Sequence, residues 1–386
     1  MKAELINRET DLPTVPVQEL LTHVLTMDAS DLHLTVGAKP TVRIHGDLRP
    51  LDQYDILEPD QVRRMVYAIL TQRQRERLEQ DLELDMSYSL PGRARFRVNV
   101  YFQRDAVGAA FRFIPFTIRT VEELGLPPQV SDFARLPRGL VLVTGPTGSG
   151  KSTTLAALID VVNTEREVHI MTIEDPIEYL HAHKKCVVNQ RELHADTHSF
   201  ANALRAALRE DPDVVLIGEM RDLETIESAL RIAETGHLTF ATLHTNSAAQ
   251  TINRIIDVFP AHQQSQVRAQ LSLTLEGIMC QSLLPKASGS GRCLAMEILI
   301  PNAAIRNLIR EDKIHQIYST MQTGQEKYGM QTFNQSLASL YFAKQISLQT
   351  ALGISSLPEE LQDMINRGAG LSTPQSGGRP GPRPGR

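Results

Sequence analysis

Residues 145–152 read Gly145-Pro146-Thr147-Gly148-Ser149-Gly150-Lys151-Ser152, which fits the pattern Gly-x-x-x-x-Gly-Lys-Ser/Thr. The apolar run 139–144 precedes the motif, and a helical pattern begins at Thr153. A buried strand, a glycine-rich turn and a helix form the context in which this pattern binds nucleotide phosphates. The glycines let backbone N–H groups turn toward the β-phosphate at the positive end of the helix. Lys151 would add charge to the β- and γ-phosphates, and Ser152 a hydroxyl to Mg²⁺. Residues 145–153 therefore predict a phosphate-binding loop.

The chain after this loop alternates between apolar runs and helical patterns. Apolar runs of strand length occur at 168–173, 214–217 and 239–243, and helical patterns occur at 199–210 and 223–235. Such alternation predicts an α/β fold with a doubly wound, mainly parallel sheet. Beyond residue 263 the sequence predicts a largely helical segment that ends near residue 353.

Carboxylates follow two of these runs. Glu219 comes just after the run 214–217, and Glu174 and Glu178 come after the run 168–173. Open α/β sheets bind ligands at the carboxyl ends of their strands. We therefore expect Glu219 to hold Mg²⁺ through water or to polarise the attacking water, and one of Glu174 and Glu178 to act as a general base.

Two histidines frame the run 239–243. His237 and His244 have no cysteine or further histidine close by in the sequence, which argues against a metal site. His244 lies at the carboxyl end of the expected strand, so we predict that it donates a hydrogen bond to a γ-phosphate.

The first 115 residues predict a separate α+β domain. The expected elements are helices at 17–27 and 59–79 and strands at 32–36, 41–44, 86–90, 94–102 and 107–114, which would form an antiparallel sheet with helices on one face. The proline-bearing stretch 115–138 is the expected domain boundary and hinge, with the interdomain linker at 116–138. The second domain would span 139–353, followed by a tail at 354–386 that we expect to be disordered from about residue 372.

Arginines gather on the last strands of the first domain. Arg95 and Arg97 alternate with apolar residues, so they share one face of a strand. Phosphoryl transfer builds charge on the γ-phosphate oxygens, and an arginine supplied by a neighbouring subunit can stabilise that charge. This face could therefore meet a neighbour's nucleotide.

Composition excludes several other classes of protein. The chain has 386 residues, a net charge of −5, 5% aromatic residues and no Trp, which argues against nucleic-acid binding as its main role. Its apolar runs are too short to cross a bilayer, so membrane association would go through a partner. Its three cysteines form no CxxC pair, which favours a reducing, cytosolic compartment.

The motifs, taken in order, resemble the secretion-ATPase superfamily, and within it the pilus retraction ATPases of the PilT, twitching-motility family. The matching segments are 29–34, 145–153, 172–178, 218–222 and 236–245, together with 304–311 and 329–337, which are more specific to the retraction branch.

This resemblance implies a homohexameric motor that uses ATP and Mg²⁺. Each subunit would have a small PAS-like domain and a RecA-like ATPase domain, with ATP at their junction. The site residues that it implies are Lys151 and Ser152 on phosphates and Mg²⁺, Glu178 or Glu174 as the catalytic carboxylate, Glu219 at the second acidic position, His237 and His244 in a histidine box, and Arg97 and Arg112 on the nucleotide.

The resemblance also implies partners and a location. The ring would be cytoplasmic, at the inner face of the cell membrane, where it would act on the inner-membrane platform protein of a type IV pilus. A paralogous pilus ATPase is a further expected partner, and nucleic acid is not. Relatives in assembly and secretion commonly carry a zinc-binding tetracysteine insert; Cys280 and Cys293 stand alone here, so we expect no zinc.

Three alternatives stay open. One is a pilus-assembly or type II secretion ATPase, against which the missing tetracysteine and the segment 304–311 argue. Another is a RecA-like DNA translocase, which would need a strongly basic channel. The third is an accessory subunit that hydrolyses ATP poorly, which would need a broken acidic or histidine box.

Overall fold

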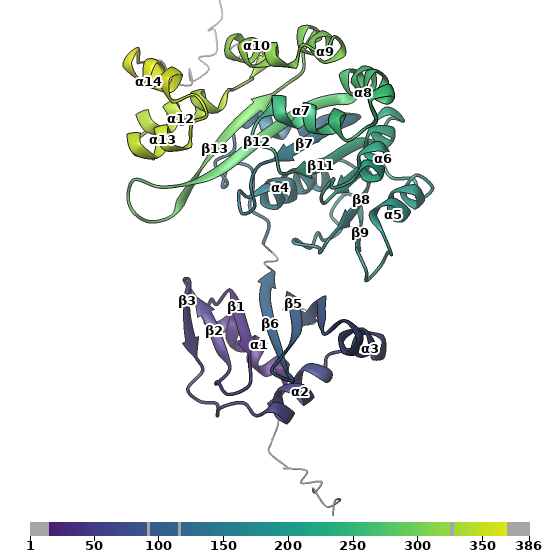
Figure 1. Cartoon of the computed structure of the whole chain (residues 1–386), viewed down its shortest axis with the longest axis vertical. Helices are drawn as coiled ribbons and strands as arrows, with labels where there is room; N and C mark the ends of the chain where they lie inside the picture. The colour runs from purple at the N-terminus through teal and green to yellow at the C-terminus, as the bar shows by residue number, and fades with distance from the viewer. Residues whose placement is uncertain (1–14, 91–92, 115–116, 325–327, 369–386) are drawn as a thin grey trace, which may run out of the picture. The chain divides into compact units, whose positions relative to one another are not determined.

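The computed structural model describes residues 15–90, 93–114, 117–324 and 328–368, which fall into two compact units (Figure 1). The first unit comprises Met1–Ile118 together with Pro176–His181, and the second comprises Arg119–Asp175 and Ala182–Arg386. Pro115, at the start of the expected domain boundary, and the tail from about residue 372 lie outside the described residues.

The first unit is built on an antiparallel sheet with the strand order β3-β2-β1-β6-β5-β4. Its elements are α1 (Val17–Thr26), β1 (Asp31–Leu34), β2 (Thr41–Ile44), β3 (Asp47–Pro50), α2 (Pro59–Tyr67), α3 (Gln72–Asp81), β4 (Glu83–Leu90), β5 (Ala94–Gln103) and β6 (Ala106–Ile114).

The core of the first unit lies between this sheet and its three helices. Leu20 of α1, Val62 of α2 and Leu78 of α3 are buried in one cluster with Phe96 and Phe111 of the sheet. Because strand side chains alternate between faces, the expected antiparallel sheet with helices on one face follows, and this prediction is confirmed.

The single helix expected over 59–79 is wrong. The structure ends α2 at Tyr67 and begins α3 at Gln72, because Thr71 forms a capping box with Gln74. Strand β3 was not predicted. All four of its residues are exposed, so it has no buried face to produce an apolar pattern.

The second unit is built on a seven-stranded sheet with the strand order β13-β12-β7-β11-β10-β8-β9. Its elements are η1 (Pro128–Arg135), β7 (Gly139–Thr144), α4 (Lys151–Glu165), β8 (His169–Glu174), β9 (Val187–Glu192), α5 (Phe200–Ala207), β10 (Val214–Ile217), α6 (Leu223–Glu234), β11 (Leu238–Leu243), α7 (Ala248–Asp257), α8 (Ala261–Thr274), β12 (Leu275–Pro285), β13 (Arg292–Leu299), α9 (Ala303–Arg310), η2 (Ile314–Gln316), α10 (Ile317–Thr323), α12 (Phe333–Phe342), α13 (Leu348–Ile354) and α14 (Pro358–Asn366).

Both faces of this sheet are covered. Leu140 and Leu142 of β7 pack into one cluster with residues of α5–α8, whereas Val141 and Val143 pack into another with α4 and η1. The strands pair in parallel except β12 with β13. The predicted α/β fold with a doubly wound, mainly parallel sheet is therefore confirmed.

The largely helical segment expected beyond residue 263 is wrong in one respect. Strands β12 and β13 form an antiparallel hairpin there, and β12 joins the sheet in parallel beside β7 (Figure 1). The strand β9, at the other end of the sheet, was also not predicted. Helices α12–α14 pack against the hairpin through a small cluster that includes Leu284 and Leu337.

Part of the expected linker packs within the second unit. Val121, Leu126, Val130 and Phe133 are buried in the same cluster as α4. Among the residues that the structure describes, no helix combines the length and apolarity needed to span a bilayer.

Candidate nucleotide site

The predicted phosphate-binding loop connects β7 to α4. All six residues of β7 are buried, and the loop leaves it through Gly145, whose φ is +139°. A side chain at this position would collide with the backbone carbonyl of Gln281, so only glycine fits. Gly150, with φ +89°, is the N-cap residue of α4. This conformation lets the backbone curve around a phosphate at the positive end of the helix.

The loop is held by its own lysine and by the neighbouring strand. The Nζ of Lys151 donates to the carbonyls of Gly145 (2.9 Å) and Pro146 (3.2 Å), which keeps the ammonium at the loop. From β12, the Nε2 of Gln281 donates to the carbonyl of Ser149 (2.8 Å). The Thr144 hydroxyl lies 3.0 Å from the buried Sγ of Cys280.

A second group of side chains follows β10 and β11 at the same edge of the sheet. The Nε2 of His244 lies 3.2 Å from one carboxylate oxygen of Glu219, and the guanidinium of Arg221 donates to the other at 2.9 Å. Burial alone would raise the pKa of Glu219, but the hydrogen bonds and charges of Arg221 and His244 outweigh it and lower the pKa. Glu219 is therefore held ionised.

Glu174 ends β8 at this edge. Its Oε1 accepts hydrogen bonds from the hydroxyl of Thr172 (2.6 Å) and the amide of Gln190 (3.2 Å). The next strand, β10, passes close by, because a Cβ on Gly218 would lie 3.2 Å from the Cα of Glu174. The structure therefore brings Glu174, Glu219 and His244 to the edge of the sheet that carries the loop.

His237 lies at the opposite end of β11, away from the loop. Strand register pairs Leu238 with Gly139, at the start of β7, whereas Leu243 pairs with Thr144, next to the loop. The six residues of β11, at roughly 3.3 Å each, separate the two histidines. The Nδ1 of His237 contacts the carbonyl of Ile232 at 3.0 Å, which ties it to the end of α6.

The other predicted residues belong to the first unit. Arg97 and Arg112 are cross-strand partners on β5 and β6, and both are exposed. The Nε of Arg112 donates to Asp31 at 2.9 Å. Burial would raise the pKa of the Asp31 carboxyl, but its hydrogen bonds from Ser30 and Arg112 lower it. Glu178 is exposed in the segment Pro176–His181 that groups with this unit.

Sequence reasoning assigned no role to two residues that support the site. Arg221 holds Glu219, and Gln281 holds the loop. The sequence signal of Gln281 was weak, because it follows the apolar run 278–280 and is itself followed by the polar Ser282; the structure shows that only 2% of its surface is exposed. A buried polar side chain requires a hydrogen-bond partner, and here the loop supplies it.

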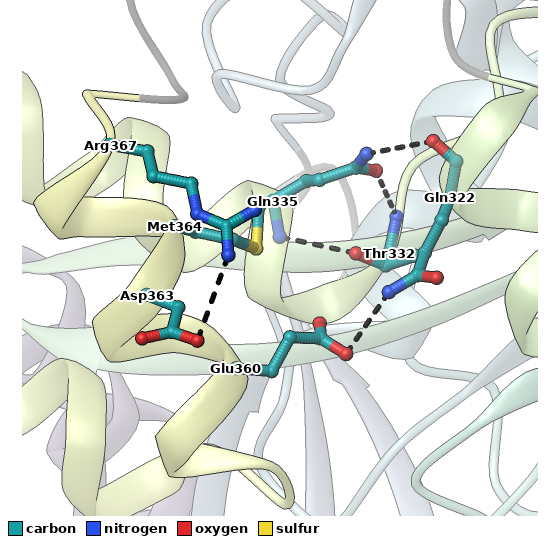
Figure 2. A pocket seen from close by; sticks show the side chains of 7 residues that line it. All are labelled: Gln322, Thr332, Gln335, Glu360, Asp363, Met364 and Arg367. Carbon is teal, nitrogen blue, oxygen red and sulfur yellow. Dashed lines mark hydrogen bonds and ion pairs between the residues drawn. The ribbon is translucent and has the colours of Figure 1, made fainter.

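A groove elsewhere in the second unit lies among α10, α12 and α14 (Figure 2). Its charged groups are paired with their neighbours: Gln322 donates to Glu360 at 3.0 Å, and Arg367 lies 4.0 Å from Asp363. None of the predicted site residues lines it. This groove is therefore separate from the group of residues around the predicted phosphate-binding loop.

Residues 9–327 match the family described as "Type II/IV secretion system protein". The chain is 52% identical over 343 residues to the "Type IV pilus retractation ATPase PilT" of Pseudomonas aeruginosa, covering 89% of this chain and 99% of that protein. It is 54% identical over 301 residues to the "Twitching motility protein" of Neisseria gonorrhoeae, covering 78% and 80%. A crystal structure of the "Pilus Retraction Motor PilT and Bound ADP" superposes with a TM-score of 0.86 at 52% identity, over 91% of this chain and 100% of that one.

Proposed function

Because the chain belongs to the family of type II/IV secretion system proteins, we propose that it is the ATP-hydrolysing motor that powers type IV pilus retraction and twitching motility. The observation that carries this proposal is the loop at 145–153, which has the backbone conformation expected of a phosphate-binding loop and lies in a chain similar to a retraction ATPase over 89% of its length. The chain is a P-loop ATPase with an α/β fold.

The loop and its lysine account for nucleotide binding. Backbone N–H groups of residues 145–150 and the first turn of α4 would surround the β-phosphate. Lys151, now bonded to two loop carbonyls, would move its ammonium onto the β- and γ-phosphates. Its charge offsets that of the triphosphate and orients the γ-phosphoryl group for attack by water.

The oxygen donors at this edge suit Mg²⁺. Ser152 offers a hydroxyl in the first turn of α4, and Glu219 offers a carboxylate that its surroundings keep ionised. Mg²⁺ prefers such oxygen ligands and keeps several waters. When bound, the ion would neutralise charge on the β- and γ-phosphates.

Hydrolysis would draw on the acidic and histidine residues. Glu174, oriented by Thr172 and Gln190, or Glu178 would accept the proton of the attacking water. His244 would donate to the γ-phosphate while that group is present and return to Glu219 after its loss. This exchange gives the site a way to report which nucleotide it holds.

Arginines of the first unit would complete the chemistry. Arg97 and Arg112 would stabilise the charge that develops on the γ-phosphoryl oxygens. We assign this unit as the PAS-like domain and the second as the RecA-like ATPase domain, with ATP at their junction. The γ-phosphate would favour a closed junction, and its release would let the junction open around the part of the linker that precedes the buried Val121.

The working assembly in this proposal is a homohexameric ring. It would lie in the cytoplasm at the inner face of the membrane and pass its movement to the pilus platform protein, with a paralogous ATPase as a further partner. In support, the chain is also 41% identical over 352 residues to the "Type IV pilus ATPase PilU" of P. aeruginosa.

The test compares ATP turnover and particle mass for the native chain and Lys151→Ala. We expect the substitution to abolish turnover while the particle stays the size of a hexamer, because the lysine acts on phosphates. If the native chain hydrolyses ATP as a monomer, the proposal of a hexameric motor is wrong. A Lys151→Ala variant with native turnover would overturn the assignment of the loop.

A further inference from the structure

We propose that Gln281 is a positioning residue for nucleotide binding, which holds the phosphate-binding loop in its binding shape without touching the nucleotide. This inference rests on the proposed binding of nucleotide at residues 145–153. It adds to that proposal a residue that lies 132 positions beyond Ser149 in the sequence, on a strand outside the loop.

Gln281 reaches both ends of the loop. Strand β12 runs parallel to β7, and the pairing of Cys280 with Thr144 places Gln281 beside Gly145, where the loop begins. The backbone carbonyl of Gln281 fills the space that a side chain at 145 would need. Its side-chain amide then reaches the end of the loop, where Nε2 donates to the Ser149 carbonyl at 2.8 Å. A Cβ on Gly150 would lie 3.3 Å from the same Nε2.

The hydrogen bond to Ser149 follows from what the loop must do. If backbone N–H groups turn inward to a phosphate, carbonyl groups of the same peptides turn outward, into the protein. Ser149 is only 3% exposed, so an outward carbonyl there needs a donor from the protein. The bond from Gln281 therefore stabilises the loop in the conformation that presents its N–H groups.

The orientation of the Gln281 amide leaves its oxygen without a hydrogen bond in the part of the chain that the structure describes, which costs free energy. Since a carbonyl needs a donor, the amide presents Nε2, and its Oε1 is buried with no hydrogen-bond partner among the described residues. A residue placed there for packing alone would not need to leave an acceptor unpaired. Methionine, which is similar in size, would remove the unpaired acceptor together with the donor.

Gln281→Met should therefore weaken nucleotide binding more than it weakens the fold. Without its donor, the loop would turn the Ser149 carbonyl to other partners and would have to rearrange at binding. An unpaired buried carbonyl corresponds to a loss of roughly tenfold in affinity. ADP and ATP should lose the same factor, because both present a β-phosphate to the loop. KM should rise while kcat stays near the native value.

The Gln281→Glu variant tests whether residue 281 acts on the loop as a hydrogen-bond donor or only through its packing. A protonated carboxyl can donate to the Ser149 carbonyl, whereas the ionised form can only accept and repels both that carbonyl and the phosphates. Burial raises the pKa of an introduced carboxyl group. The affinity of this variant for ADP, relative to the native chain at the same pH, should therefore recover as the pH falls from about 8 to about 6.

The experiment measures ADP binding by calorimetry for the full-length native chain, Gln281→Met, Gln281→Glu and the control Gln331→Met, with melting temperatures for each. Gln331 is a matched control, because its Nε2 also donates to a backbone carbonyl, that of Met296, at 2.8 Å, away from the loop. We expect about tenfold weaker binding for Gln281→Met, native affinity for Gln331→Met, and recovery at low pH for Gln281→Glu alone.

Two results would overturn the inference: ADP binding by Gln281→Met within about twofold of native, or a pH profile of Gln281→Glu parallel to the native one. If Gln281→Met does not fold, the pH profile of Gln281→Glu decides. A native chain that fails to bind ADP would instead refute the proposed function.

Discussion

The substitution Gly145→Ala tests whether β12 shapes the phosphate-binding loop. It adds one methyl group where φ is +139°, and that methyl would collide with the Gln281 carbonyl and lie 2.8 Å from the Ser149 hydroxyl. The carbonyl belongs to a strand paired on both sides, with β7 and β13, so it has little room to move. Gly148→Ala is the matched control, because its φ is +78° and, its two chain neighbours aside, none of the described residues has a heavy atom within 4 Å of the added Cβ.

The two substitutions should lower the free energy of unfolding by amounts that differ several-fold. A non-glycine residue in the left-handed region costs about 1 kcal/mol, which is the whole cost expected for Gly148→Ala. At Gly145 the conformation lies outside that region and the collision adds to the strain, so we expect about 3–5 kcal/mol. For a unit of this size each kcal/mol lowers the melting temperature by about 2–4 °C.

Calorimetric melting of the full chain, with ATP turnover measured in parallel, provides the assay. We expect the melting temperature to fall by about 10 °C for Gly145→Ala and by about 3 °C for Gly148→Ala. ATP turnover should be lost in Gly145→Ala, because the displaced loop no longer presents its N–H groups. Equal shifts for the two variants, or a native melting temperature for Gly145→Ala, would refute the contact with β12.

Three further predictions concern Arg306 and Arg310 of α9 and Glu219 at the nucleotide site. Arg306→Ala should lower the free energy of unfolding by about 2–3 kcal/mol, because Arg306 makes paired bonds of 3.0 Å to Glu276 and also binds two carbonyls at the end of α8. Arg310→Ala, at an exposed site on α9, should keep native stability and ATP turnover but reduce pilus retraction in cells, because it lies in the segment 304–311 that resembles the retraction branch; normal retraction would contradict this. Since the pKa of Glu219 is lowered from the ordinary 4.5, its interactions stabilise the fold above that pH, and this stability is lost as the pH falls through the folded-state pKa. Urea midpoints between pH 5 and pH 3 should fall less steeply in Glu219→Gln, and identical slopes would contradict this.

Local patterns predicted the parts of the site that lie close together in sequence. The glycines, Lys151 and Ser152 form one uninterrupted motif, and buried runs marked β7 and β10 directly. The break between α2 and α3 was also readable, because Thr71 and Gln74 have the spacing of a capping box. The apolar periodicity over 59–79 continues across this break, and for that reason we predicted a single helix.

The remaining features depend on pairing between distant segments. The segment 275–285 mixes apolar and polar residues in a pattern that suits a strand or a helix equally, and only its pairing with β7 decides between them. His237 and His244 look equivalent in sequence, but the register of β11 places them at opposite edges. The partners of Glu219 and Ser149, which are Arg221 and Gln281, likewise depend on how neighbouring strands and turns pack.

The position of the β12–β13 hairpin bears on how the protein is made. During synthesis the glycine-rich motif leaves the ribosome long before Gln281, which is 132 residues later than Ser149. Domains fold as the chain emerges from its N-terminus, so the growing polypeptide carries an unbraced motif until the hairpin is translated. A fragment that ends before the hairpin thus contains every residue of the loop 145–153 but lacks β12, the strand that the loop packs against.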